Sequence, residues 1–115
     1  MTVLRIIPNL TAPDPAALGR FWAEVLGLAP VMDHGWIVTL AGGTQSAQLS
    51  LAAEGGSGTP VPAVSIEVDD LDACHDRALA AGGTVTHGPV AEDWGVRRFF
   101  LRDPAGNLVN LLSHR

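Results

Sequence analysis

The chain has 115 residues, enough for one domain with a real core, and carries seven Arg and no Lys against twelve Asp and Glu, a formal net charge of −5. This acidity argues against nucleic acid or an anionic membrane as partners and would attract a cationic ligand, although it also simply promotes solubility. Because the chain has no Lys and no Tyr, catalysis by a lysine amine or by a tyrosine phenol is excluded. The single cysteine, Cys74, excludes an intramolecular disulfide. No apolar run could cross a bilayer, and residues 1–10 lack the pattern of a signal peptide, so we expect a soluble cytoplasmic protein.

The first half of the chain predicts a strand, a helix and three more strands. The strand covers residues 3–10, with Pro8 indicating a bulge or a sheet edge. Asp14 caps a helix that begins at Pro15, carries apolar residues at helical spacing and stops at Gly27. Strands at 29–32, 36–40 and 47–52 follow, with turns at 33–35 and 42–44.

The second half repeats this order after a segment, 54–62, that has the composition of a linker. A strand at 63–68 precedes a helix that Asp70 caps and Gly82-Gly83 ends, and strands at 84–87, 96–102 and 108–113 follow. A shift of 56 residues lays Asp14 over Asp70 and Gly27 over Gly83, which indicates an internal duplication. We therefore predict one domain, 1–115, of two modules at 1–53 and 63–115 joined by the linker at 54–62.

Three sequence motifs resemble those of the vicinal oxygen chelate superfamily, which includes glyoxalase I, extradiol dioxygenases, fosfomycin-resistance enzymes and bleomycin-resistance proteins. They are FWAEVLGL at 21–28, IEVDDLD at 66–72 and RDPAGNLVNLL at 102–112. Within the superfamily the chain looks most like bleomycin-resistance proteins, through Pro8-Asn9-Leu10, Gly35-Trp36 and Asp93-Trp94-Gly95. The resemblance implies an α+β fold in which two tandem βαβββ modules form a curved mixed-sheet cup around a ligand.

Metal-dependent members of this superfamily place His, Gln or Glu on the first and last strands of each half. The matching residues here are Ile7, Ala63, Asn110 and either Gln48 or Ser50, a register that the sequence leaves open. Ile and Ala cannot ligate a divalent ion, and one or two amides do not make a catalytic centre. The resemblance therefore implies a protein without a metal or other cofactor.

The histidines and the cysteine do not suggest a metal site of their own. The four imidazoles lack the close spacing of a zinc motif, and we expect them to be exposed or loosely hydrogen-bonded: His34, His75, His87 and His114. Cys74 lies on the apolar side of a predicted helix and is expected in the core.

Strand alternation selects side chains that could line the cup. Trp36 and Trp94 could stack on a planar ligand or equally cover the rim or a dimer seam, whereas Trp22 is expected in the core. Arg97 and Arg98 point to opposite faces, and the sequence leaves open which of them meets an anionic group. The candidate ligand-binding residues are Arg5, Asn9, Trp36, Gln48, Ser50, Glu67, Trp94, Arg98 and Asn110.

Three functions remain open on the sequence. The favoured one is a metal-free homodimeric protein that sequesters a small molecule, such as a cationic bleomycin-like antibiotic. The second is a glyoxalase- or dioxygenase-type enzyme, using an unrecognised metal site or Glu67, an arginine and Asn110. The third is a structural or regulatory dimerisation module. Dimerisation is expected in each case because a half-open sheet leaves edges to cover.

Overall fold

A computed structural model describes residues 1–43 and 46–114, so Thr44 of the turn expected at 42–44 lies outside the described residues. The chain divides into two compact units. Residues 7–61 form the α1 unit, and residues 1–6 together with 62–115 form the α2 unit. Both combine helix and mixed sheet, which confirms the α+β prediction. Among the described residues, no helix has the length and apolarity to span a membrane.

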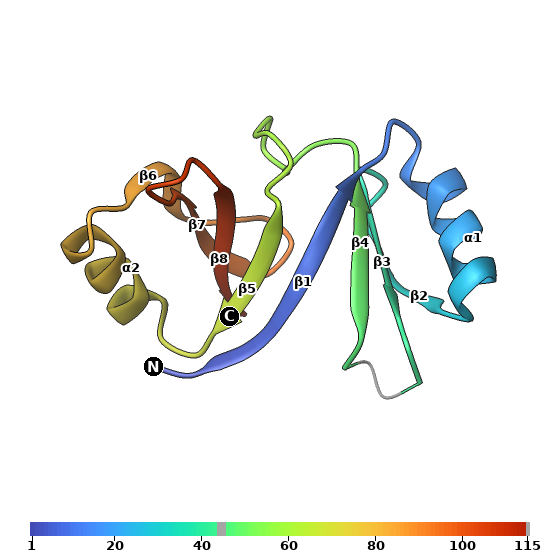
Figure 1. The fold of residues 1–115 in the computed structure, drawn as a ribbon, viewed down its shortest axis with the longest axis horizontal. Coiled ribbons are helices and arrows are strands. Elements are labelled where there is room, and N and C mark those ends of the chain that lie inside the picture. The colour runs from blue at the N-terminus through green and yellow to red at the C-terminus, as the bar shows by residue number, and fades with distance from the viewer. Residues whose placement is uncertain (44–45, 115) are drawn as a thin grey trace. The chain divides into compact units, whose positions relative to one another are not determined.

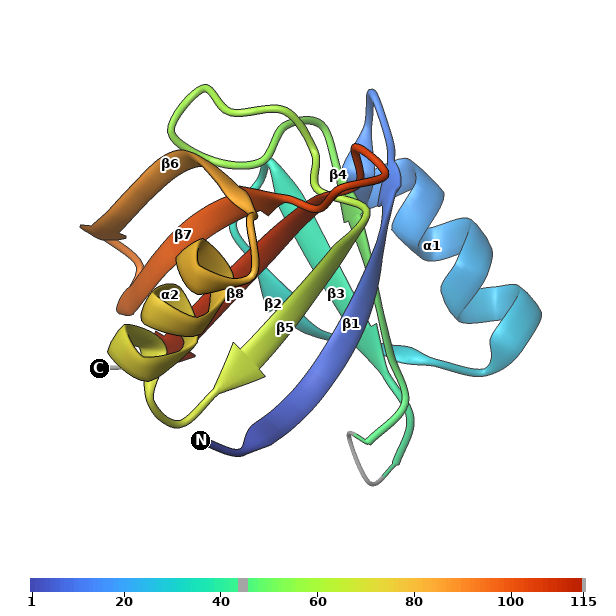
Figure 2. The same ribbon diagram turned by 60° about the vertical axis from the view of Figure 1, so that its left-hand side comes forward.

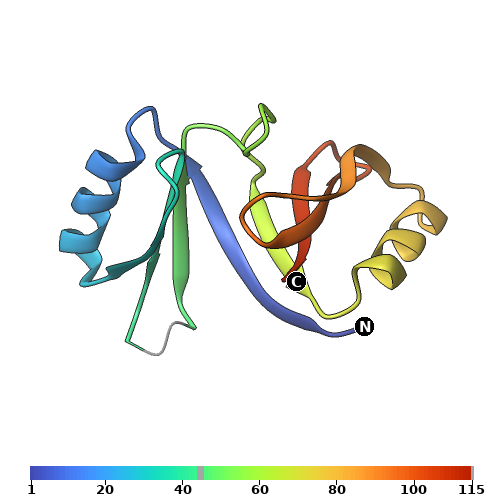
Figure 3. The same ribbon diagram turned by 180° about the vertical axis from the view of Figure 1, so that it is seen from behind.

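The α1 unit packs one helix on a small mixed sheet (Figures 1 and 3). Its elements, in chain order, are β1 (Val3–Thr11), which starts in the other unit, α1 (Pro15–Leu26), β2 (Ala29–Asp33), β3 (Ile37–Ala41) and β4 (Gln48–Ala52). The strand order is β2-β3-β4-β1, with only the β1–β4 pair parallel. Leu18 and Trp22 of α1 pack on a core of Val38, Leu40 and Leu51, and Trp22, expected in the core, is half-buried against it.

The α2 unit repeats this plan, with α2 lying against the sheet (Figure 2). Its elements are β5 (Val64–Val68), α2 (Leu71–Ala80), β6 (Thr84–Ala91), β7 (Val96–Arg102) and β8 (Leu108–His114). The strand order is β1-β5-β8-β7-β6, and the β5–β8 pair is parallel. The helix-side core is Val68, Leu71, Phe99 and Leu111, with Cys74 packed against it.

The helix ends follow the sequence signals. Asp14 and Asp70 each accept a hydrogen bond from the backbone N–H three residues on, at 3.2 and 3.0 Å. Gly27 adopts the left-handed conformation, with φ of 66°, that ends α1. In α2 the cap is Ala81, and the left-handed residue is Gly82, with φ of 90°.

Two strand expectations need correction. Of the two structures that Pro8 indicates, a bulge or a sheet edge, the edge is excluded, because β1 has β4 and β5 as neighbours in the strand order. Pro8 is tolerated there because the β1–β4 register begins one residue later, at Asn9. β6 runs on to Ala91 rather than ending at His87, since register shifts accommodate Gly88-Pro89 within the strand.

The segment expected as a linker contains a hydrogen-bonded turn. The N–H of Gly55 donates to the carbonyl of Thr59 at 2.7 Å, and the N–H of Gly58 donates to the Glu54 carboxylate at 3.0 Å. A β-carbon at Gly55 would lie 2.1 Å from the carbonyl oxygen of Pro60, so only glycine fits there.

Candidate functional site

The sheet of the α2 unit has two chemically different faces. Phe99, Leu101 and Leu111 pack with the α2 core, so alternation turns Arg98, Phe100 and Asn110 to the face away from α2. One cross-strand row on that face is set by the register and contains Ser65, Asn110, Phe100 and His87, from β5, β8, β7 and β6. The candidate site of this unit is built around that row.

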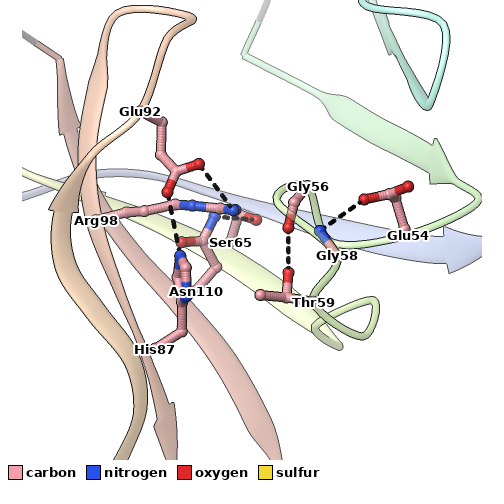
Figure 4. Close-up of polar contacts among 9 residues, drawn as sticks. All are labelled: Glu54, Gly56, Gly58, Thr59, Ser65, His87, Glu92, Arg98 and Asn110. Carbon is pink, nitrogen blue, oxygen red and sulfur yellow. Dashed lines mark hydrogen bonds and ion pairs between the residues drawn. The ribbon is translucent and has the colours of Figure 1, made fainter.

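Asn110 lies at the centre of this face and is only 8 % exposed. Its Nδ2 donates to Ser65 Oγ at 3.1 Å (Figure 4). Its Oδ1 is buried and accepts no hydrogen bond from any residue that the structure describes. A buried acceptor without a donor is uncommon in folded proteins. The side-chain oxygen of Asn110 is therefore expected to accept a hydrogen bond from a group other than the described residues.

A buried group of charges, which we name the Glu92 cluster, joins β6 to β7. It consists of His87, Glu92 and Arg98. His87 Nε2 lies 3.1 Å from Glu92 Oε1, and Arg98 Nη2 lies 3.5 Å from Glu92 Oε2 (Figure 4). Glu92 is 5 % exposed and Arg98 is 2 % exposed. Burial lowers the pKa of the Arg98 guanidinium, and the nearby Glu92 carboxylate opposes that shift.

Aromatic rings enclose the guanidinium of Arg98. Its central carbon lies 4.9 Å from the centre of the Trp94 ring and 4.7 Å from that of Phe100. Arg97 instead pairs with Asp72 of α2 at 2.7 Å. Arg98 therefore lies on the face away from α2, with Trp94 packed on it, and Arg97 lies on the α2 side.

A second charged group lies on the same face, where Glu67 meets Arg5 and His114. Both of its carboxylate oxygens are engaged, one by Arg5 Nε and one by His114 Nδ1, each at 2.5 Å. Burial raises the pKa of Glu67, but the hydrogen bonds and charges of His114 and Arg5 outweigh it and hold the pKa below its usual value.

The expectation of exposed or loosely bonded histidines is therefore wrong for His87, which is half-buried against the Glu92 carboxylate. His114 is exposed as expected, although it also contacts Glu67. His34 does stack beside Trp36, with ring centres 6.3 Å apart, and His75 meets Phe99 edge-on at 5.1 Å. Period-two alternation does not reveal such pairs, because the partner of His87 is a residue of the β6–β7 hairpin turn.

The remaining candidates belong to the α1 unit. Asn9 lies opposite Ser50 in the β1–β4 register, and Ser50 Oγ is 2.7 Å from Thr39 Oγ1 inside the unit. Gln48 is half-buried at the start of β4. Trp36 precedes β3, and its ring stacks beside that of His34.

The register also identifies the residues at the metal positions of the resembled family. Asn9 faces Ser50 as Ser65 faces Asn110, so Ser50 rather than Gln48 is the counterpart of Asn110. The four positions are then Ile7, Ser50, Ala63 and Asn110, which offer a hydroxyl and an amide but no carboxylate or imidazole. These residues do not fit a divalent ion. No group of three or more His, Cys, Asp or Glu side chains that could hold a metal occurs in residues 1–43 and 46–114.

A shallow hollow of about 170 Å³ lies elsewhere in the α1 unit, between α1 and strands β2 and β3. Its apolar wall includes Gly19, Val38 and Leu40, and two opposite charges, Arg20 and Asp33, also line it. It contains none of the candidate ligand-binding residues.

Comparison with known proteins places the chain in a family. Its fold resembles a NAD-dependent benzaldehyde dehydrogenase structure from Legionella pneumophila, with a TM-score of 0.77, 16 % identity and coverage of 96 % of this chain and 99 % of that one. It also resembles a Streptomyces coelicolor methylmalonyl-CoA epimerase, with a TM-score of 0.70, 18 % identity and coverage of 98 % and 99 %. A Vibrio splendidus 12B01 member of the glyoxalase/bleomycin resistance protein/dioxygenase superfamily gives a TM-score of 0.67, 18 % identity and coverage of 99 % and 100 %.

At these identities the three structures establish the fold alone. No curated protein matches the chain. The sequence profile named Glyoxalase, which describes the Glyoxalase/Bleomycin resistance protein/Dioxygenase superfamily, matches residues 4–111. The chain therefore belongs to the Glyoxalase/Bleomycin resistance protein/Dioxygenase superfamily.

Proposed function

We propose that this protein binds a small organic molecule without a metal ion, on the face of the α2 unit that carries Asn110. The observation that supports this is the buried Asn110 Oδ1, which receives no hydrogen bond from the described residues. An acceptor of this kind costs about 1–3 kcal/mol unless a donor satisfies it. A ligand N–H or O–H group would supply that donor.

The neighbouring side chains define what such a ligand would meet. Ser65 and the aromatic rings of Phe100 and Trp94 belong to the same face or its hairpin, and Arg98 and Glu67 contribute charges that their neighbours hold in place. A ligand with amide groups and a flat apolar part matches this combination. Asn9, Trp36, Gln48 and Ser50 remain candidates within the α1 unit.

A bleomycin-like antibiotic is the ligand that we would test first. It is rich in amide N–H donors, and its positive charge suits a protein of net charge −5. Sequestration of such a molecule would make the protein an antibiotic-resistance factor. We would titrate the folded protein with metal-free bleomycin by calorimetry and follow tryptophan fluorescence in parallel.

The expected result is saturable binding with quenching of tryptophan emission. Asn110→Leu should weaken it about 5- to 100-fold, the equivalent of one lost hydrogen bond in a buried site. Thr86→Val, at an exposed residue of β6, is the matched control and should leave affinity unchanged. Absence of saturable binding by the folded protein contradicts the antibiotic assignment, and undiminished binding by Asn110→Leu contradicts the site.

The alternative, a glyoxalase- or dioxygenase-type enzyme, would use either a metal held by residues other than Ile7 and Ala63 or a metal-free mechanism with Glu67, an arginine and Asn110. Treatment with a chelator separates the binding protein from the metal-dependent form of this enzyme. A binding protein should keep its fold and its ligand affinity, whereas a metalloenzyme of this type should lose bound metal and activity together.

We also propose that the protein is a cytoplasmic homodimer. Phe21, Val25 and Leu26 of α1 are each more than half exposed, an apolar area that a second copy would cover. Sedimentation should give twice the monomer mass, and Phe21→Ser combined with Val25→Ser should return it to that of the monomer. A wild-type protein that sediments as a monomer contradicts the dimer.

A further inference from the structure

His87 and Glu92 form the imidazole–carboxylate pair of the Glu92 cluster. His87 Nε2 lies 3.1 Å from Glu92 Oε1, and the Glu92 side chain is 4 % exposed. The His87 side chain is 23 % exposed, so the imidazole joins a buried carboxylate to the surface of the unit. Contact with the Phe100 ring, at 5.5 Å between centres and 68° between planes, restricts its rotation.

The hydrogen bond to Glu92 determines where the imidazole carries its proton. A carboxylate only accepts, so a neutral His87 must donate from Nε2, and its lone pair is then on Nδ1. No hydrogen bond to Nδ1 comes from the residues that the structure describes. The pair thus presents a basic nitrogen whose tautomer and ring orientation are set by a buried group.

The charges around the pair suit proton transfer. A proton taken up at Nδ1 makes an imidazolium ion directly against the Glu92 carboxylate, which stabilises it. Arg98, 3.5 Å from the other carboxylate oxygen, holds that carboxylate in place from the opposite side. The cluster can therefore hold the positive charge that His87 gains when it takes a proton from a neutral molecule.

We infer that His87 is a general base, positioned by Glu92, that removes a proton from the activated C–H bond of a small neutral organic molecule without help from a metal. The role goes beyond ligand binding, and it does not depend on the hydrogen bond proposed for Asn110. His87 is the catalytic residue of this inference, and Glu92 is a positioning residue.

The elimination of 5-nitrobenzisoxazole tests this chemistry with a defined probe. His87 Nδ1 would take the proton of the C–H bond, and the electron pair of that bond would complete the C≡N triple bond. The N–O bond would break with its electron pair left on oxygen, which gives a coloured phenolate. The reaction is an isomerisation, so it needs no oxidant, reductant or second substrate.

The expected result is that His87→Gln lowers the second-order rate about 100-fold, the lower end of what a positioned base contributes. His34→Gln, which changes an exposed turn histidine of the α1 unit, is the matched control and should retain the wild-type rate. Circular dichroism must show that each variant is folded. Equal rates for the wild type and His87→Gln would overturn the inference. The cluster would then have only a structural role, stabilising the β6–β7 hairpin.

A spectroscopic measurement tests the positioning by Glu92. The ¹⁵N resonances of His87 should show the tautomer protonated at Nε2 in the wild type. In Glu92→Gln the side-chain amide can donate to Nε2, which moves the proton to Nδ1 and removes the base, so the rate should fall by about 100-fold. A wild-type His87 protonated at Nδ1 would overturn the inference even if Glu92→Gln failed to fold.

Discussion

The two units share an order of elements and matching strand registers, but their side chains at matching positions differ in chemistry. The registers align Thr39, Ser50 and Asn9 of the α1 unit with Phe100, Asn110 and Ser65 of the α2 unit. The first set contains a buried pair of hydroxyls, 2.7 Å apart. In the second set an aromatic ring, an amide and a hydroxyl lie beside a buried ion pair.

Neighbouring positions show the same contrast. Ile37 occupies the position of Arg98, and Thr11 that of Glu67, so the α1 unit has no counterpart of either charged group at these positions. On the helix side, Gly19 of the α1 unit lies next to Val38. The matching positions of the α2 unit hold His75 and Phe99, whose rings are in contact. A duplicated fold can thus keep its registers and caps while one copy takes on buried charges.

Among substitutions in the two units, removal of the Glu92 charge should cause the largest loss of folding stability. Glu92→Gln leaves the buried Arg98 guanidinium without its counter-charge, and we expect it to lower the free energy of unfolding by about 3–5 kcal/mol. Urea denaturation followed by circular dichroism would measure this loss. The double variant Glu92→Leu with Arg98→Met should recover most of it, because no unpaired charge then remains buried.

The hydroxyl pair of the α1 unit is the control for this prediction. Ser50→Ala leaves Thr39 without its partner and should cost about 1–2 kcal/mol, well below the cost at Glu92. Similar losses in the two units would mean that the buried charges contribute no more than neutral hydrogen bonds.

The contribution of Glu67 should depend on pH. Its folded pKa lies below the usual 4.5, so the ionised carboxylate stabilises the folded state at pH values above about 4.5. That stability is lost as the pH falls through the lower folded pKa. Glu67→Gln should therefore cost about 1 kcal/mol near pH 7, since Arg5 and His114 are partly exposed, and almost nothing near pH 3.

Glu24→Gln, an exposed carboxylate of α1, provides the comparison and should change stability by less than about 0.5 kcal/mol at either pH. A Glu67→Gln deficit that is the same at both pH values would show that the effect comes from packing and not from charge.

The smallest expected effect concerns the hollow beside α1. A β-carbon at Gly19 would lie 3.4 Å from Val38 Cγ1, an ordinary contact, so Gly19→Ala should fit. We expect it to raise stability by about 0.4–1 kcal/mol, because alanine loses less conformational freedom than glycine in a helix. A melting temperature below that of the wild type would show that the two elements are packed too closely for a methyl group.

The sequence predicts the fold well because its signals are local. The caps Asp14 and Asp70 and the order of elements are each set by a few adjacent residues, and all are confirmed. The β6 boundary is predicted wrongly because Gly88-Pro89 resembles a strand end, whereas the register shift that retains it depends on pairing with β7.

The candidate site is predicted less completely, for a physical reason. Alternation assigns a face to Asn110 and Arg98, but it does not say which charges meet. The partners of Glu92 come from two strands, β6 and β7, and those of Glu67 also come from two strands, β1 and β8. Such contacts depend on side-chain conformations in the folded unit. Trp94 stays a candidate for ligand contact, and its ring packs on Arg98, a contact that alternation does not predict.

The division of β1 between the units has a consequence for the order of folding during synthesis. Residues 7–61 form one compact unit and are synthesised before residues 62–115 of the other unit. Residues 1–6 must wait, because Thr2 bonds to Asp69, 67 positions later, and Arg5 to Glu67. Until Glu67 and Asp69 have been synthesised, residues 1–6 lack these two partners, so the start of β1 joins the α2 unit only after the whole stretch 7–61 has been made.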